Sequence, residues 1–280
     1  MRNPFKKKKY EYIDIDIRNG CVFSAHSYLN FQSRSDSTLK MVIDTLKNNF
    51  KSNFRKKIRI YTGDYPNVKP KKNSFFYCCE KSENNQNAFP DFGFDSWPQA
   101  GILNYSTLTS QISEEGEKNA AYNKLFWIGN AKTNPIRDKF LEITANNTDL
   151  IEAYCTNVDH FVLDHKKVPY VSLQDHTKYK YLIDIEGNGY SGRLKILLFT
   201  KRLLFIQDRK WKEFYHYDLK PYVHFIPVKN DLSDLLDQIK MVKEKGEDFY
   251  NEIVNNASEF AKNNLTYGHA LERIKTLINL

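Results

Sequence analysis

Two stretches of the chain share one local pattern: a short apolar run, a glycine-bearing loop and a helical segment with an early arginine. In the first, residues 125–128 lead through Gly129 into a predicted helix over 136–143. In the second, residues 181–185 lead through two glycines into a helical pattern after residue 190. Apolar runs of this length are typical of buried strands, and strand–loop–helix units build parallel sheets. The two stretches therefore predict an α/β fold.

Strand and helix patterns alternate along most of the chain, which favours parallel α/β layers. Strict alternation predicts a half-exposed strand at residues 11–18, and apolar residues at helical spacing behind Asp36 or Ser37 predict a helix over 36–50. Further strands are expected at residues 57–61, 73–79, 125–128, 150–155, 181–185, 203–206 and 224–228, and further helices at 110–122, 136–143, 231–245 and twice within 247–280. A boundary between two domains is expected near residues 105–124.

The composition is that of a globular protein with an excess of basic residues. Hydrophobic residues make up 41% of the chain, and 42 basic against 34 acidic side chains leave a formal net charge of +8. This excess favours phosphorylated or polyanionic partners. The basic residues are dispersed and no nucleic-acid-binding motif occurs, so we expect no nucleic-acid partner.

The sequence contains neither a membrane-spanning run nor a secretory signal. No apolar run approaches the roughly 18 residues of a transmembrane helix, and residues 1–10 are basic without an apolar segment behind them. We therefore expect a cytoplasmic protein. The run Lys6–Lys9 is expected to be a solvated tail, with peripheral membrane contact as the alternative. The four cysteines lack paired metal-ligand spacing and are expected to be free thiols.

The glycine loops and their arginines predict a pocket for an anion. The first N–H groups of a helix have no internal partner, and Ser191 suits the N-cap of the helix that would carry Arg193. Arg137 occupies the matching place in the first unit, so both arginines could converge on one nucleotide diphosphate. The alternative is an ordinary strand-to-helix connection with arginines on the surface.

An aspartate follows closely on the predicted strand at residues 57–61. Asp64 lies in T-G-D-Y-P, between a glycine and the Tyr65-Pro66 pair. Open α/β sheets bind ligands at the carboxyl ends of their strands, so Asp64 could act as a general base. The alternative is a turn aspartate.

A loop at residues 89–98, F-P-D-F-G-F-D-S-W-P, interleaves aromatic residues with Asp and Gly between prolines. This composition predicts no regular element, yet it is too apolar for plain surface. The loop could stack on a sugar ring, or it could form a packed aromatic plug.

Two patterns are compatible with a metal site. Asp14-Ile15-Asp16 is a D-x-D sequence on a predicted strand, where alternation places both carboxylates on one face; the same alternation also explains them as the solvent face. Asp159-His160 and Asp164-His165 have ligand-like spacing, but no third ligand group follows them. The first pattern leaves a metal-dependent enzyme of GT-A type as an alternative function.

Several local sequences together resemble glycosyltransferase family 90, which includes capsule proteins, lipopolysaccharide-modifying proteins and Rumi-type protein O-glucosyltransferases. Gly63–Pro66 resembles the family's R-D-Y/W-P, Pro90–Pro98 resembles P-D-F/W-S-F-W-G-W-P, and Ile128-Gly129-Asn130 with Arg137 resembles an aromatic-R-G-S…R segment. The most specific block is similar to D-H-x-K-Y-K-Y-L…G…S-x-R, and it comprises Asp175, His176, Lys178–Leu182, Gly187, Ser191 and Arg193. The resemblance continues through Glu213-Phe214, Leu219–Val228 and Asp231–Leu235.

The resemblance implies a GT-B architecture, with two Rossmann-like domains facing a central cleft and terminal helices that pack back on the first domain. The implied units are residues 1–115 on the acceptor side, 116–250 for the UDP-sugar, and 251–280 for the returning helices. It also implies an inverting transfer from a UDP-sugar to a glycan hydroxyl, without a metal or other cofactor. UDP-xylose is the first choice of donor and UDP-glucose the second, which would make the protein a β-xylosyltransferase.

The same resemblance implies roles for individual residues. Asp64 would be the catalytic base. The acceptor or donor-sugar loop would contain Tyr65, Asp91, Phe92, Asp95 and Trp97. The nucleotide sugar would be bound by Gly129, Asn130, Arg137, Asp175, His176, Lys180, Ser191, Gly192, Arg193 and Glu213. Three positions depart from the family pattern: Ile128 stands where arginine is usual, Asn130 replaces serine, and Asp95 replaces an aromatic residue.

A binding protein without chemistry is a further alternative. A basic α/β protein that recognises polyanions or nucleic acid would show a steep salt dependence of binding and indifference to substitution of Asp64.

Overall fold

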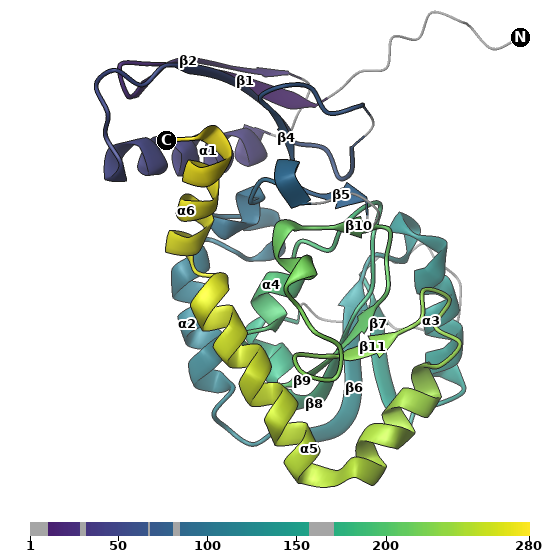
Figure 1. Ribbon diagram of the computed structural model, residues 1–280. Helices are drawn as coiled ribbons and strands as arrows, with labels where there is room; N and C mark the ends of the chain where they lie inside the picture. Colours follow the sequence, from purple (N-terminus) through teal and green to yellow (C-terminus); the bar gives the residue numbers. More distant parts are fainter. Residues whose placement is uncertain (1–10, 29–31, 67, 81–84, 157–170) are drawn as a thin grey trace, which may run out of the picture.

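The computed structural model describes residues 11–28, 32–66, 68–80, 85–156 and 171–280. Its strands form two larger sheets, one in the N-terminal part and one in the C-terminal part, and a short two-stranded pair between them (Figure 1). The Lys6–Lys9 run and the Asp159–His165 pattern lie outside the described residues.

The N-terminal sheet is mixed and has the order β2-β1-β3-β4. It consists of β1 (Tyr12–Arg18), β2 (Cys21–Tyr28), β3 (Lys56–Tyr61) and β4 (Ser74–Phe76). β1 is antiparallel to β2 and β3, whereas β3 and β4 are parallel. This sheet differs from the Rossmann-like sheet expected for residues 1–115, because Asn19 and Gly20, with φ of 52° and 71°, turn the chain back into a hairpin.

One face of the N-terminal sheet is buried by α1 (Gln32–Asn48). Ile13, Ile15 and Ile17 alternate with polar residues along β1 and share a core with Met41 and Val42 of the helix. The predicted strand and helix are thus both present, with the helix beginning four residues earlier than expected at residue 36.

The C-terminal sheet is parallel throughout and has the order β11-β9-β8-β6-β7. Its strands are β6 (Tyr122–Gly129), β7 (Ile151–Cys155), β8 (Tyr179–Asp184), β9 (Leu203–Gln207) and β11 (Ile226–Val228). In chain order this is the doubly wound arrangement 2-1-3-4-5, whose order reverses between β6 and β8. The prediction of an α/β protein with a parallel sheet is confirmed.

Helices cover both faces of this sheet. Leu125 and Trp127 of β6 belong to one core with α3 (Pro135–Ala145) and α5 (Leu235–Asn264). Phe126 and Ile128, which point to the other face, belong to a second core with α2 (Tyr105–Glu115) and α4 (Leu194–Leu197). The helix predicted at residues 110–122 begins earlier and ends sooner, because Asn104 caps its first turn and residue 122 already opens β6.

The chain ends with helices that return to the N-terminal part (Figure 1). α5 consists of two helical stretches that meet at Gly246, whose φ of 80° and ψ of −171° are not helical, so the helix predicted at 231–245 and the two predicted within 247–280 are present. α6 (Tyr267–Ile278) then lies against α1. The Tyr267 hydroxyl donates to Asp44 Oδ2 at 2.7 Å, and the Lys56 ammonium donates to the Ile278 carbonyl at 2.7 Å.

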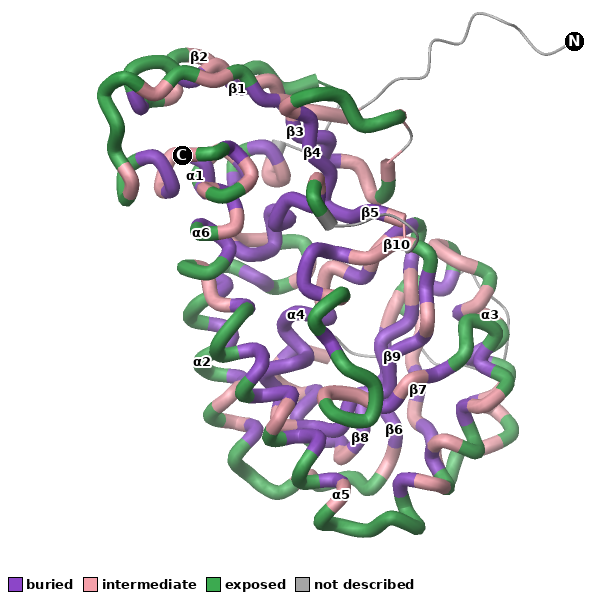
Figure 2. The backbone as a smooth tube through the Cα atoms, viewed as in Figure 1, coloured by how far each residue is buried: buried purple, intermediate pink, exposed green. Residues whose placement is uncertain are grey.

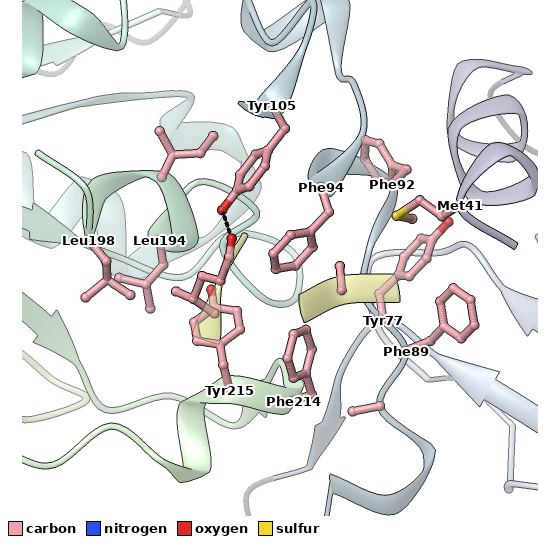
Figure 3. Close-up of a cluster of buried hydrophobic side chains, with 14 of the residues drawn as sticks. Met41, Tyr77, Phe89, Phe92, Phe94, Tyr105, Leu194, Leu198, Phe214 and Tyr215 are labelled. Atoms are coloured by element: carbon pink, nitrogen blue, oxygen red, sulfur yellow. Dashed lines mark hydrogen bonds between the residues drawn. The ribbon is translucent and has the colours of Figure 1, made fainter. Parts of the chain in front are cut away.

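The two parts share one hydrophobic core, and the C-terminal part has a second core of its own on the other face of its sheet. Phe94 of the N-terminal part contacts Phe214 of the C-terminal part, with ring centroids 5.7 Å apart, and Leu194 and Leu198 of the α4 region join the same cluster (Figure 3). Buried segments occur in both sheets and in the region between them (Figure 2). β5 (Cys79–Glu80) and β10 (Trp211–Lys212) add a short antiparallel pair across the junction. In the part of the chain that the structure describes, no helix is both long and apolar enough to span a membrane.

Candidate active site

The strand order locates the candidate site. β6 and β8 are neighbours in the sheet, but the helices that follow them, α3 and α4, pack in the two different cores on its opposite faces. Such a switch point leaves a crevice at the carboxyl ends of the strands. Gly129 and Asn130 end β6 here, and the segment from Asp184 to Arg193 leaves β8 here. Both predicted glycine loops therefore reach the same edge.

A fully buried aspartate organises the loop after β8. Asp184 accepts a hydrogen bond from the Ser191 hydroxyl at 2.6 Å and pairs with Arg209 at 2.7 Å. Arg193 approaches the same carboxylate at 3.9 Å. Burial of a carboxylate is tolerated only when it is paired and hydrogen-bonded, and Asp184 has both kinds of partner.

The predicted helix start at Ser191 is wrong. α4 runs only from Leu194 to Leu197, and Arg193 at its N-cap position makes no side-chain capping bond. The hydroxyl of Ser191 bonds Asp184 instead, because the carboxylate is within reach seven residues earlier in the chain. One turn of helix contributes little dipole, so positive charge at this edge comes from arginines and not from a helix end.

Arg137 and Arg193 both lie against the ring of Trp127; their predicted convergence on a diphosphate stays a prediction. Their guanidinium carbons lie 5.4 and 5.9 Å from the centroid of this ring. Arg137 donates to the carbonyls of Glu186, Asn130 and Ile185 at 2.8, 2.9 and 3.0 Å, so it ties the two loops together. Burial, reinforced by the neighbouring Arg193, lowers the pKa of Arg137 to about 9. Burial also lowers the pKa of Arg193, whose guanidinium donates to the Ile128 carbonyl.

The loop after β6 is shaped by the same tryptophan. A Cβ at Gly129 would lie 2.7 Å from the Trp127 ring, so only glycine allows the chain to pass there. Asn130 accepts a hydrogen bond from the backbone N–H of Lys132 at 2.9 Å, and its carbonyl binds Arg137. Gly129 and Asn130 thus lie beside the arginines, as predicted.

Asp64 lies against the loop that follows β8, although 124 residues separate it from Asn188. Its Oδ2 accepts a hydrogen bond from Asn188 at 3.2 Å, and its Oδ1 pairs with Arg34 at 3.0 Å. A Cβ at Gly189 would lie 1.8 Å from the Asp64 carbonyl oxygen, so the two backbones touch. The Asp64 side chain is nevertheless 38% exposed, which leaves the carboxylate accessible.

The residues predicted to contact the acceptor or the donor sugar lie in different environments. Tyr65 stacks on Trp211 with centroids 5.6 Å apart and is half exposed. Phe92 is buried and packs edge-on against the partly buried Trp97 at 5.4 Å, so the prediction of a packed plug holds for Phe92 (Figure 3). Asp95 pairs with Lys40 of α1 at 2.9 Å and therefore faces the N-terminal helix.

The side chains of Asp91 and Glu213 both contact the buried ammonium group of Lys195. Lys195 lies 2.8 Å from Asp91 Oδ1 and 3.3 Å from Glu213 Oε1, and all three side chains are buried. Glu213 Oε2 accepts a hydrogen bond from Tyr215 at 2.7 Å, so both of its carboxylate oxygens have internal partners. Burial raises the pKa of Glu213 to about 8, whereas the two carboxyls outweigh burial and raise the pKa of Lys195.

The remaining predicted nucleotide contacts lie away from the crevice. Lys180 is near the amino end of β8, where it pairs with Glu247 of α5. Asp175 bonds the Ser172 hydroxyl and Lys178, both at 2.7 Å, and so closes a local turn. These two residues are at the opposite edge of the parallel sheet from Asp64, because they precede the strand that leads to the site.

His176 is buried on the face of the sheet against Phe126, with centroids 5.0 Å apart. Its Nδ1 contacts the Ser172 carbonyl at 2.9 Å, and its Nε2 has no hydrogen-bond partner within the described residues. Burial, with Arg193 as the next cause, lowers the pKa of His176 to about 4, so its imidazole is neutral at neutral pH.

The D-x-D pair on β1 has internal partners. Asp14 receives two hydrogen bonds from Arg59, both at 2.6 Å, and Asp16 pairs with Arg18 at 2.7 Å. Among the residues outside the masked gaps at 1–10, 29–31, 67, 81–84 and 157–170, no group of three His, Cys, Asp or Glu side chains is arranged to hold a metal ion.

Four residues of the site were missed from the sequence. Arg34 and Asn188 hold Asp64, whereas Arg209 and Lys195 neutralise buried carboxylates. Lys195 carried a usable signal, because it is the one charged residue in the apolar run L-K-I-L-L-F. Nothing in the local sequence marks the other three.

Comparison with known proteins places the chain in a family. The sequence model described as glycosyl transferase family 90 matches residues 6–279. Protein O-glucosyltransferase 1 of Rattus norvegicus and that of Homo sapiens are each 34% identical over 148 residues, which is 51% of this chain and 38% of theirs. O-glucosyltransferase rumi of Drosophila melanogaster is 34% identical over 131 residues, covering 43% of this chain and 32% of its own. The chain therefore matches well under half the length of these relatives.

Two solved structures match part of the chain at low TM-scores. The glycosyltransferase from Rickettsia africae ESF-5 has a TM-score of 0.36 at 12% identity and covers 61% of this chain and 42% of its own. TarM has a TM-score of 0.38 at 15% identity, covering 76% and 40%. The sequence match, which extends over nearly all residues, is the stronger finding, and by it this protein belongs to glycosyl transferase family 90.

Proposed function

We propose that the protein is an inverting glycosyltransferase of GT-B type, which moves a sugar from a UDP-sugar to a hydroxyl group of a glycan acceptor without a metal ion. One observation carries the proposal. Asp64 of the N-terminal part meets Asn188 and Gly189 at the switch point of the parallel sheet, in the same loop that carries Arg193. A carboxylate and a cationic crevice on facing parts are what such a transfer requires.

The proposed base is Asp64. Its two oxygens are oriented by Arg34 and Asn188, and its side chain stays accessible. In an inverting transfer, the acceptor oxygen attacks the anomeric carbon from the face opposite to UDP, and Asp64 takes the hydroxyl proton as the bond to UDP breaks. A weakly basic carboxylate suffices, because the hydroxyl becomes acidic as the new bond forms.

The leaving diphosphate would be stabilised by the arginine cluster. Arg137, Arg193 and Arg209 converge around Asp184, with Glu186 beside them, and burial raises the pKa of Glu186. Three guanidinium groups against the two carboxyl groups of Asp184 and Glu186 leave a positive excess, which an anionic ligand would balance. Arg193 is the proposed phosphate contact, whereas Arg137 holds the loops. This cluster supplies the charge that a metal ion supplies in other transferases.

Two UDP-sugars are candidate donors in this proposal. The resemblance of the motifs favours UDP-xylose and then UDP-glucose, whereas the names of the relatives speak for glucosyl transfer. Hydrolysis of both UDP-sugars, followed by NMR of the released sugar or product, separates these donors and reports the anomeric configuration. Absence of binding and turnover with every UDP-sugar tested would reject the proposal.

The base is tested by Asp64→Asn. This change keeps the shape of the side chain but removes its charge and basicity and replaces one acceptor oxygen by a donor NH2 group, so transfer should fall by about 10²–10⁴-fold while the Kd for UDP stays near wild type. The matched control is Asp16→Asn, which alters a paired aspartate on the N-terminal sheet and should retain transfer. Loss of UDP binding in Asp64→Asn would make the aspartate structural.

The metal-dependent alternative is tested in the same assay. Transfer should be unchanged by EDTA and by Asp14→Asn, because Asp14 is bound by Arg59. Inhibition by EDTA that added Mn²⁺ or Mg²⁺ reverses would favour the alternative.

A further inference from the structure

Lys195 is fully buried in α4, and its ammonium group has three acceptors. They are the Gly192 carbonyl at 2.6 Å, Asp91 Oδ1 at 2.8 Å and Glu213 Oε1 at 3.3 Å. A lysine has three N–H donors, so this set matches its full capacity. A buried ammonium is unfavourable unless it is paired in this way, which makes the arrangement a specific one.

The three acceptors come from separate segments of the chain. Asp91 belongs to the aromatic loop of the N-terminal part, Gly192 to the loop after β8, and Glu213 to the segment after β10. Lys195 therefore connects both parts of the molecule and contacts the loop that carries the candidate site. Its ammonium also lies 5.2 Å from the centroid of the Phe94 ring, inside the shared core.

The bond to Gly192 fixes the loop that carries the site. On one side of Gly192, Ser191 is bound to Asp184, and on the other Arg193 is bound to the Ile128 carbonyl. The loop also packs closely on the aromatic segment, because a Cβ at Gly192 would lie 3.1 Å from the Trp97 ring. Further along, Asn188 and Gly189 contact Asp64.

We propose that Lys195 is a positioning residue for sugar transfer: by holding the Gly192 carbonyl and Asp91 together, it keeps the 187–193 loop, with Arg193, in place against Asp64. The inference rests on the proposed function of this site. It differs from a purely structural role, in which Lys195 would stabilise the core while the loop kept its place without it.

The test compares Lys195→Met with Tyr215→Phe. Methionine keeps the length of the side chain but removes every donor. Tyr215→Phe disturbs the same buried cluster, because it deletes the hydrogen bond to Glu213, yet it leaves the bond to Gly192 intact. Amide hydrogen exchange across residues 187–193 is expected to accelerate at least tenfold in Lys195→Met and less than twofold in Tyr215→Phe. With UDP-sugar, kcat/KM should fall at least tenfold in the first variant and less than twofold in the second.

Two results would overturn the inference. One is wild-type exchange and kcat/KM in Lys195→Met; the other is a loss in both variants that simply follows their loss of Tm. If Lys195→Met does not fold, the triple variant Asp91→Asn, Lys195→Met, Glu213→Gln replaces the three titratable side chains by neutral ones and is measured in its place, with the same expected results. If the wild type turns over no UDP-sugar, the proposed function fails, and the exchange data still decide whether Lys195 holds the loop.

Discussion

Arg193 and Arg137 look equivalent in the sequence but have different partners in the fold. Arg137 binds three backbone carbonyls, whereas Arg193 has one carbonyl and a distant approach to Asp184. A guanidinium group has five donors, so Arg193 retains more capacity for a phosphate oxygen. The convergence of the two arginines was predictable from their equal places after two strands. Their different roles were not predictable from the sequence, because these roles depend on which backbone carbonyls the folded loops place within hydrogen-bonding distance of each guanidinium group.

The role of Arg193 is tested by Arg193→Ala. Removal of a charge-assisted hydrogen bond to phosphate should weaken UDP binding by about 1.5–3 kcal/mol, roughly 10–100-fold in Kd. Arg18→Ala removes an arginine from the N-terminal sheet and should leave the Kd unchanged. Isothermal titration calorimetry with UDP measures both variants. Equal UDP affinity of Arg193→Ala and wild type would exclude Arg193 as a phosphate contact.

At the scale of secondary-structure elements, local sequence patterns predicted the buried strands of the sheets more accurately than the first residues of the helices. The parallel strands and α3 lie where apolar periodicity predicted them. The start at Ser191 failed because a buried carboxylate competes for its hydroxyl. β2 was missed although Asn19-Gly20 is a strong turn signal, because the residues after it lack apolar alternation; its side chains are mostly exposed or half-buried. Whether such a segment starts a helix or forms a strand depends on contacts with residues that are distant in the sequence.

The kink in α5 can be tested at Gly246. Its φ of 80° and ψ of −171° are accessible almost only to glycine, and no atom lies within 4 Å of an added Cβ. Gly246→Ala should therefore lower the free energy of unfolding by about 1–3 kcal/mol through backbone strain alone. UDP binding should be unaffected, because the kink lies beside Lys180 and Glu247 at the far edge of the sheet.

The control for this change is Gly268→Ala in α6. The nearest atom to an added Cβ there is Thr266 Oγ1 at 3.7 Å, so alanine fits and favours the helix. Urea titration should show unchanged or increased stability. Equal stability of Gly246→Ala and wild type would mean that the helix straightens at no cost.

At the scale of the whole molecule, Glu213 links stability to pH. Its pKa rises from 4.5 to about 8 on folding, through burial, against the opposing effect of Lys195. The folded state then binds the proton more tightly than the unfolded state, so the stabilisation is complete below about pH 4.5 and is lost as pH rises toward 8. The charged or titratable groups that face this carboxyl include Lys195, Asp91, Tyr105, Tyr190, Tyr215 and Cys78.

Glu213→Gln isolates this contribution. Glutamine cannot ionise, so the free energy of unfolding should lose the downward slope of up to about 1.4 kcal/mol per pH unit that Glu213 gives the wild type. Urea unfolding at pH 5, 6, 7 and 8 provides the comparison. Parallel curves for the two proteins would show that Glu213 does not take up a proton on folding in this range.

The hydrophobic core that both parts share affects how the protein unfolds and how its crevice can open. Apolar side chains from both sheets, from α4 and from α6 belong to one cluster, so each part buries some of its apolar surface only against the other, although the C-terminal part also has a core of its own. Folding should then be a single cooperative transition in which calorimetric and van't Hoff enthalpies agree. Opening the crevice to admit an acceptor would have to bend the loops at its mouth and leave the aromatic junction closed, since rigid rotation of the two parts would expose Phe94, Phe214 and their neighbours to water.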